Sequence, residues 1–201
     1  MKKRHVAVIG SAFNPPHLGH KDVIEQVYQS FDEILLVPSF KHAFGKKMVP
    51  FEHRLYMASM MGQCFHNESY IQYGEHTPIL TSDIEREIGA QKEGPVYTFD
   101  VLEALEKKYQ KAGIESELTF IVGPDNASFE TWSKFYRGDE ILERWKLRSV
   151  SERIAVHSTE IRKLISEFPR PSFLFEARFK KYMDGMVANY IYNNRLYGVH
   201  A

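Results

Sequence analysis

The chain has 201 residues, and its 26 Lys and Arg residues are balanced by 26 Asp and Glu residues. This length suits one sizeable α/β domain with a full core. Zero net charge argues against nucleic acid or an anionic membrane as a partner, so any phosphate-binding charge must be local. Cys64 is the only cysteine, which excludes an internal disulfide and a cysteine-based zinc cage. A reducing compartment is expected.

The chain carries no apolar run close to the roughly 18 residues that a membrane-spanning helix needs. The basic start MKKRHVAVIG resembles a signal peptide, but its apolar run VAVI is too short. We therefore expect a cytoplasmic protein.

The first elements form a βαβ unit. Residues 5–9 read as a buried strand, residues 17–31 place apolar side chains at helical spacing, and residues 34–37 read as a second buried strand. The short joints predict that the two strands are parallel neighbours with a right-handed crossover.

The alternation of helices and strands continues along the chain. We predict helices over 51–65, 98–109, 129–136, 139–145 and 158–165, and strands over 70–73, 118–123 and 153–156. The stretch EFPRPS, residues 167–172, ends the helical pattern because proline cannot continue a helix; helical patterns then resume to residue 196. The predicted fold is a doubly wound α/β parallel sheet, with residues 1–166 forming the main domain and residues 167–201 a helical extension packed on it. Ligands of such sheets bind beyond the carboxyl ends of the strands.

The stretch GSAFNPPHLGH follows the first strand. Gly10 lets a ligand approach the end of that strand, and Pro16 suits the first turn of the next helix. His17 and His20 are three residues apart, on one face of that turn, and Gly19 between them leaves room for a ligand. Free amides and the positive end of the helix dipole favour phosphate there. Binding of phosphate and protonation of the histidines should therefore be coupled.

Other interpretations of this stretch remain open. It is also compatible with a capped helix start whose histidines are incidental. A metal site is a weaker alternative, because no third ligand has an obvious spacing. The dinucleotide fingerprint GxGxxG is absent, which argues against a dehydrogenase of the usual kind.

A second signal lies in HSTEIRKLI, residues 157–165. Ser158 and Thr159 offer hydroxyls and amides at a helix start, and Arg162 follows one turn later with a planar guanidinium suited to phosphate oxygens. Alone, the stretch is compatible with an ordinary helix cap followed by an exposed arginine. Together with the first stretch it points to a polyphosphate site.

The two stretches together resemble the nucleotidyltransferase superfamily, with its HxGH and STxxR-type motifs. Within it, FEHRLYM, YTFDVLEAL, IVGPDNASFETW and YIYNNRLYG are similar to the nicotinate mononucleotide adenylyltransferases, over nearly the whole chain. The resemblance implies a Rossmann-like fold and a reaction in which the phosphate of nicotinate mononucleotide attacks the α-phosphorus of ATP and releases pyrophosphate. It implies Mg²⁺ bridging the triphosphate and no covalent enzyme intermediate.

The resemblance also implies roles for individual residues. Gly10, Ser11 and Phe13 line the cleft between the substrates and belong to the ATP-binding set; His17 and His20 contact phosphates, and His20 stabilises the transition state. Ser158, Thr159 and Arg162 hold the β- and γ-phosphates, and the catalytic set is His17, His20 and Arg162. On the mononucleotide side, the implied residues are Lys47, with Lys41 and Lys46 as competitors, and Arg54, Thr98, Gly123, Asp125 and Trp132.

Several of these residues also have plain structural interpretations. The lysine loop is compatible with a solvated basic segment, Arg54 with a surface position on an amphipathic helix, and Thr98 with a helix N-cap. By the resemblance, Thr98 and Trp132 form the nicotinate pocket, and Trp132 stacks on the pyridine ring. Asp125, which follows Gly123 at the end of a predicted strand, is expected to accept hydrogen bonds from ribose hydroxyls, whereas the alternative is that an Asp in a GPDN turn is ordinary turn chemistry.

The sequence departs from the family pattern in three places. Ser11 and Ala12 stand where glycine and threonine are common, and His157 stands where a small residue is usual. Only twelve residues separate Trp145 from Ser158, which predicts that a strand and a loop framing the site are shortened or lost.

Two alternative functions stay open. One keeps the chemistry and changes the acceptor to nicotinamide mononucleotide or another phosphorylated compound. The other is a catalytically silent nucleotide-binding regulatory protein. The aromatic residues Phe173, Phe175, Phe179 and Tyr182 fit either a contact in a homo-oligomer or the packing of the C-terminal helices.

Overall fold

The protein is built on a five-stranded sheet whose strands are all parallel. The structure, a computed structural model, describes residues 3–41, 47–74, 77–124, 128–167 and 175–199. The strand order is β3-β2-β1-β4-β5. The strands are β1 (Arg4–Ser11), β2 (Glu33–Pro38), β3 (Ile79–Thr81), β4 (Ser116–Val122) and β5 (Lys146–Ser149). The predicted doubly wound α/β fold and the parallel pairing of the first two strands are confirmed.

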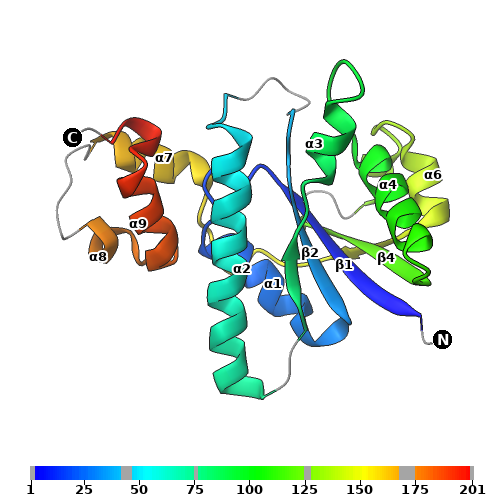
Figure 1. The fold of residues 1–201 in the computed structure, drawn as a ribbon, viewed down its shortest axis with the longest axis horizontal. Helices are drawn as coiled ribbons and strands as arrows, with labels where there is room; N and C mark the ends of the chain where they lie inside the picture. The colour runs from blue at the N-terminus through cyan, green and yellow to red at the C-terminus, as the bar shows by residue number, and fades with distance from the viewer. Residues whose placement is uncertain (1–2, 42–46, 75–76, 125–127, 168–174, 200–201) are drawn as a thin grey trace.

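Helices cover both faces of the sheet, as Figure 1 shows. They are α1 (Leu18–Val27), α2 (Phe51–Tyr73), α3 (Ile84–Gly89), α4 (Thr98–Lys111), α5 (Phe129–Trp132), α6 (Gly138–Arg144), α7 (Ser158–Glu167), α8 (Phe175–Phe179) and α9 (Gly185–Asn193). Short 3₁₀ turns lie at Tyr28–Ser30 and Leu196–Gly198. No helix in the described ranges is long and apolar enough to span a bilayer.

The apolar side chains of the strands point alternately to the two faces of the sheet, so the core has two layers. Ala7 and Ile9 of β1 pack with α1 and α2, whereas Val6 and Val8 pack with α3, α4 and α6. This follows from the period of two in a strand, which sends successive side chains to opposite faces. Every residue of β2 is buried, as expected for a strand covered on both faces.

The site is placed by the order of the strands. The chain passes from β1 to β2 on one side, and β4 returns to the other side of β1. The connections leaving β1 and β4 therefore diverge at their carboxyl ends, which opens a crevice there. Both predicted phosphate-binding stretches should converge on this crevice.

The prediction of a strand at residues 70–73 is wrong, because α2 runs on to Tyr73. It ends at Gly74, whose φ of +71° is the left-handed conformation that commonly terminates helices, and the Gly74 amide donates to the Tyr70 carbonyl. The third strand is β3, a short edge strand that pairs with β2. Three of its four residues, Tyr70, Ile71 and Tyr73, are of types that favour strands, which explains the wrong prediction.

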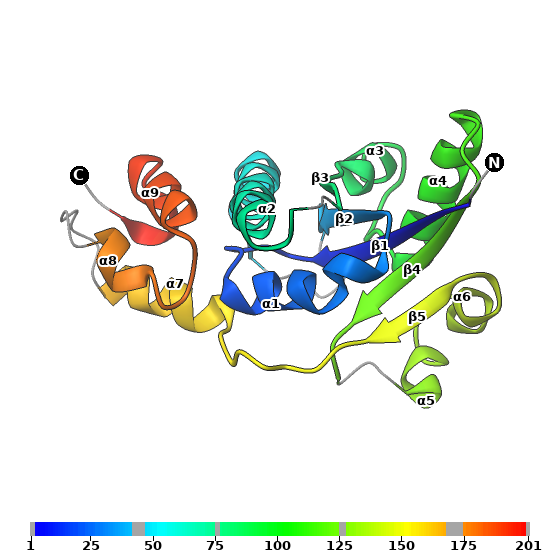
Figure 2. The ribbon, with the colours of Figure 1, turned by 90° about the horizontal axis from the view of Figure 1, so that it is seen from below.

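The prediction of a strand at residues 153–156 is also wrong. The fifth strand is β5, which lies beside β4 at the sheet edge (Figure 2). The short segment between Trp145 and Ser158 therefore still contains a strand, of four residues. The segment after β5 runs along α1: the Ser151 amide donates to Gln26 Oε1 at 3.1 Å, and Arg153 Nε donates to Asp22 Oδ1 at 2.7 Å. Side chains of α1 thus take the polar contacts that a sheet neighbour would have supplied.

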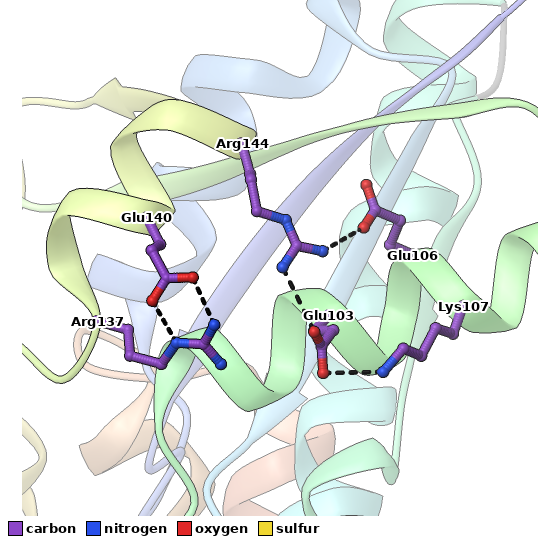
Figure 3. Close-up of polar contacts among 6 residues, drawn as sticks. All are labelled: Glu103, Glu106, Lys107, Arg137, Glu140 and Arg144. Carbon is purple, nitrogen blue, oxygen red and sulfur yellow. Dashed lines mark hydrogen bonds and ion pairs between the residues drawn. The ribbon is translucent and has the colours of Figure 1, made fainter.

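Helix α6 is attached to α4 by a surface network of charges (Figure 3). Arg144 contacts Glu103 at 3.4 Å and Glu106 at 2.8 Å, while Arg137 and Glu140 form a two-pronged pair within the α6 region. Exposed ion pairs stabilise a protein by less than about 1 kcal/mol each. The burial of Ile141 in the apolar cluster that it shares with α4 therefore contributes more to holding α6 in place than these charges do.

The C-terminal helices share the core of the main domain. In Figure 1, α7, α8 and α9 lie together, with α2 between them and the sheet. Ile161, Phe179, Val187 and Ile191 belong to the same apolar cluster as the α1 and α2 face. Phe179 is fully buried there.

Candidate active site

The loop from β1 to α1 is held by contacts from distant parts of the chain. Asn14 is 1% exposed; its Oδ1 accepts from the Val49 amide at 3.3 Å and from the Tyr197 hydroxyl at 3.0 Å. Phe13 adopts a φ of +46°, an uncommon conformation for a residue with a side chain, and its ring is buried. Phe13 therefore anchors the loop in the core rather than lining an open cleft.

His17 and His20 lie together, with their ring centroids 3.8 Å apart. His17 is the N-cap of α1, so Pro16 precedes the helix instead of starting it. The His17 amide donates to His20 Nδ1 at 3.2 Å, which completes half of a capping box with a histidine where Glu or Gln is usual. His20 Nε2 contacts Ser11 Oγ at 2.9 Å. The helix start thus orients the His20 ring.

Fewer backbone amides are free at this helix start than the sequence suggested. The Leu18 amide donates to the Tyr182 carbonyl at 2.7 Å, and the His17 amide is taken by His20. These contacts consume donors that an anion would otherwise use. The positive end of the helix dipole remains, so side chains must supply a larger share of any anion binding.

Both histidines are neutral in this environment. Burial, with a smaller contribution from nearby His157, lowers the pKa of His17 to about 4. Burial, and then the charge of His17, hold the pKa of His20 well below its usual range. His17 Nδ1 and Asn14 Nδ2 are buried and have no hydrogen-bond partner among the described residues. A ligand that meets these groups would recover part of their desolvation cost.

The second predicted stretch lies directly against the first. Ser158 Oγ donates to the Pro15 carbonyl at 2.9 Å, and Arg162 Nη1 donates to the Asn14 carbonyl at 2.7 Å. Arg162 Nη2 also donates to Thr159 Oγ1 at 3.0 Å, which holds the guanidinium over the first turn of α7. Residues more than 140 positions apart in the chain therefore form one polar surface.

A cavity of about 360 Å³ opens beside this surface, at the carboxyl ends of β1 and β2. Its lining includes Gly10, Ser11, Lys41, Glu85 and Thr98. A Cβ atom on Gly10 would lie 3.2 Å from the Phe120 ring, so a side chain there would displace that ring by a few tenths of an ångström.

The cavity has a buried carboxylate that the sequence did not reveal. Glu85 is 8% exposed, and its Oε2 accepts from the Phe40 amide at 2.8 Å. Burial raises the pKa of Glu85 to about 7, against the opposing effects of the Phe40 amide and the Arg54 charge. Its position in the short helix α3 has no sequence signal of its own.

Arg54 is buried rather than on the surface of its helix. Its side chain donates to the carbonyls of Val49 at 3.0 Å, Ala12 at 2.9 Å and Ser39 at 2.5 Å. The guanidinium thereby ties the loop after β1 to the loop after β2. Its implied contact with substrate stays a prediction, and its observed contacts are structural.

The remaining predicted residues of the mononucleotide side are more dispersed. Thr98 lines the cavity as the first residue of α4, where Tyr97 and not Thr98 is the N-cap. Trp132 is 2% exposed and packs edge-on against Phe120. Gly123 is exposed beyond β4, while Asp125 lies outside the described residues.

Of the three lysines, Lys41 lines the cavity and donates to the Gly89 carbonyl at 3.0 Å. Lys47 is exposed, and Lys46 lies outside the described residues. The structure therefore favours Lys41 over Lys47 as the lysine nearest the cavity.

A family model for cytidylyltransferase-like proteins matches residues 8–166, which contain both polar stretches and the sheet. The chain belongs to the cytidylyltransferase-like family. As a member of this family it is a nucleotidyltransferase. It is 32% identical to a protein of Myxococcus xanthus named as a nicotinate-nucleotide adenylyltransferase, over 86% of this chain and 88% of that protein. A Bacillus anthracis protein of the same name is 27% identical, over 96% of this chain and 98% of its own length.

Solved structures share the fold of this chain. A Vibrio parahaemolyticus protein named as a nicotinate-nucleotide adenylyltransferase aligns with a TM-score of 0.73 and 29% identity, covering 98% of this chain and 97% of that one. The Plasmodium falciparum nicotinic acid mononucleotide adenylyltransferase, solved with NaAD, aligns with a TM-score of 0.67 and 17% identity, covering 98% of each chain. The second likeness concerns the fold alone.

Proposed function

We propose that the protein transfers the adenylyl group of ATP to nicotinate mononucleotide and forms nicotinate adenine dinucleotide in NAD biosynthesis. The observation that carries the proposal is the meeting of Ser158 and Arg162 with the loop that precedes His17. It unites the two phosphate-binding stretches at the positive end of α1. The names of the relatives support the choice of nicotinate mononucleotide as acceptor.

The chemistry suits the groups of this surface. An oxygen of the mononucleotide phosphate bonds to the α-phosphorus, and the bond from that phosphorus to the oxygen bridging to the β-phosphate breaks, so pyrophosphate leaves with the electron pair. The protein has only to align two anions and stabilise the charge that develops between them. Arg162 and the end of the α1 dipole supply positive charge, and the neutral histidines supply N–H donors.

Mg²⁺ would enter with ATP, bound to the triphosphate oxygens. The polar groups of the surface are mainly N–H and O–H donors, which match phosphate oxygens rather than a cation. In the ranges that the structure describes, no three His, Cys, Asp or Glu residues are grouped to hold a metal ion. The ion would lower the negative charge that Arg162 and the α1 dipole must neutralise.

The cavity is where we place the acceptor mononucleotide. Lys41 offers the positive charge at its wall, and Thr98 presents the first turn of α4 to it. Both groups suit a phosphate or carboxylate anion. The cavity adjoins Ser11, so an acceptor bound there lies next to the proposed ATP surface.

The proposal is tested by incubating the protein with ATP, Mg²⁺ and either nicotinate or nicotinamide mononucleotide and measuring pyrophosphate. We expect turnover with the nicotinate compound to exceed that with the amide. Arg162→Gln should lower kcat/KM for ATP by roughly 100-fold. Lys163→Gln is the matched control, because Lys163 is the next residue of α7 and is exposed. It should act within twofold of the native protein.

Two results would redirect the proposal. Faster turnover with the amide would assign nicotinamide mononucleotide as the acceptor. ATP binding without pyrophosphate release from either compound would support the silent nucleotide-binding alternative. Equal losses in Arg162→Gln and Lys163→Gln would contradict the assignment of the polar surface to ATP.

A further inference from the structure

Among the described residues that line the cavity, Glu85 of α3 is the one acidic residue. Its side chain is largely buried, and one carboxylate oxygen, Oε2, accepts from the Phe40 amide at 2.8 Å. A carboxylate can accept about four hydrogen bonds, so this contact orients the group and leaves accepting capacity for a ligand. Glu85 is therefore an oriented hydrogen-bond acceptor in the cavity wall.

The contact with Phe40 does not by itself require a charge. Burial of Glu85 disfavours its charged form and raises its pKa to about 7, and the like charge of Asp100 in α4 acts in the same direction. The Phe40 amide and the Arg54 charge of α2 oppose the shift without cancelling it. A glutamine would accept from the Phe40 amide through its carbonyl oxygen without the cost of burying a charge. A ligand that supplies hydrogen-bond donors to the carboxylate would offset that cost.

Nicotinate mononucleotide matches this acceptor in its middle. Its phosphate and its nicotinate carboxylate are anions, which a carboxylate repels. Its ribose has hydroxyls that can donate, and the positively charged pyridinium nitrogen is bonded to the same sugar. The ionised Glu85 side chain therefore attracts the sugar region of the mononucleotide and repels both of its ends.

We propose that the Glu85 carboxylate accepts hydrogen bonds from the ribose hydroxyls of the acceptor mononucleotide and makes the cavity specific for a ribonucleotide. This inference rests on the proposed function, which places that mononucleotide in the cavity. An acceptor held by its sugar has both anionic ends free, one for the Lys41 ammonium in the cavity wall and one for the adjoining ATP surface. Glu85 thus positions the acceptor without touching the reacting atoms.

The test pairs a change in the protein with a change in the ligand. Isothermal titration calorimetry at about pH 8.5, where Glu85 is ionised, measures the Kd of nicotinate mononucleotide and of its 2′-deoxy and 3′-deoxy analogues. The native protein should bind at least one deoxy analogue roughly 30-fold more weakly, the loss expected for one hydrogen bond to a charged group. In Glu85→Gln the Phe40 amide takes the single carbonyl oxygen. This variant should therefore bind all three compounds within about threefold of one another.

Glu87→Gln is the matched control, because Glu87 lies in the same helix, is exposed and is paired with Lys108 at the surface. It should bind each compound as the native protein does, and thermal unfolding checks that each variant is folded. The comparison of the three compounds on the native protein needs no variant at all.

Two results would overturn the inference. One is a native protein that binds both deoxy analogues within about threefold of the ribose compound, and the other is a Glu85→Gln variant that keeps the native preference for ribose. Failure of the proposed function would appear differently, as a native protein that binds the mononucleotide but releases no pyrophosphate from ATP with either pyridine mononucleotide.

Discussion

Arg54 offers the sharpest test of how the site is held together. The perturbation is Arg54→Met, which keeps an unbranched apolar side chain and removes the guanidinium. In the native protein that group donates three hydrogen bonds to backbone carbonyls, at 3.0, 2.9 and 2.5 Å. Two of the acceptors lie after β2 and the third, Ala12, lies after β1. The variant should therefore loosen both loops at once.

The magnitude follows from these three bonds. Hydrogen bonds to a charged group contribute roughly 1.5–3 kcal/mol each. Burial of the guanidinium opposes them, as its lowered pKa indicates, and this desolvation cost disappears with the charge. We expect a net loss of about 3 kcal/mol for Arg54→Met. Arg54→Lys keeps the charge but has a single nitrogen, so its loss should be about 2 kcal/mol.

Urea unfolding at pH 7.5 measures these losses. Steady-state kinetics should show a lower kcat/KM for both substrates, since the two loops border the ATP surface and the cavity. Arg86→Met is the control: its guanidinium is paired at the surface with Asp83, so its loss should stay below about 1 kcal/mol. An Arg54→Met protein within 1 kcal/mol of the native free energy of unfolding would refute the idea that the Arg54 guanidinium holds the two loops together.

Three further predictions concern the cavity and its histidines. The pKa of His17, lowered to about 4 from 6.5, means that the unfolded chain binds the extra proton between these values, so stability falls as pH drops from about 6.5 towards 4. Between pH 7 and 5 the native protein should lose about 2 kcal/mol more than His17→Asn, as measured by urea unfolding; parallel curves would contradict this. The pKa of Glu85, raised from 4.5 to about 7, has the opposite effect on stability. The folded protein keeps this proton longer than the unfolded chain does, so stability falls as pH rises from about 4.5 to about 7. Glu85→Gln should therefore gain about 2 kcal/mol relative to the native protein between pH 5 and 8, and an unchanged difference would refute the burial argument. In Gly19→Ala the new Cβ would lie 3.0 Å from the His17 ring and 3.3 Å from the Ile154 carbonyl, so the ring must move. We therefore expect kcat to fall by roughly tenfold with little loss of stability. An unchanged kcat would show that the position of the His17 ring is not critical.

Local patterns predicted most of the fold and failed at its edges. The buried strands β1, β2 and β4 and the helices α1, α4 and α7 carry clear periodicity, because each buries an apolar face. The edge strands β3 and β5 expose much of their length, so their sequences show little pattern. The false strand at residues 153–156 has polar contacts that α1 satisfies, and no local pattern shows contacts with a helix 130 residues earlier.

The sequence by itself determined which chemistry was available: His17, His20 and Arg162 stand in motifs whose residue types and spacing suit phosphate. Only the tertiary structure decided how those groups are used. Arg54 became a buried clamp, Glu85 entered the cavity wall, and Ser11 came into contact with His20. The physical reason is that burial, desolvation and hydrogen-bond direction depend on which distant segments meet. A motif fixes the types of donor and their spacing, whereas the fold sets which of them still faces a ligand.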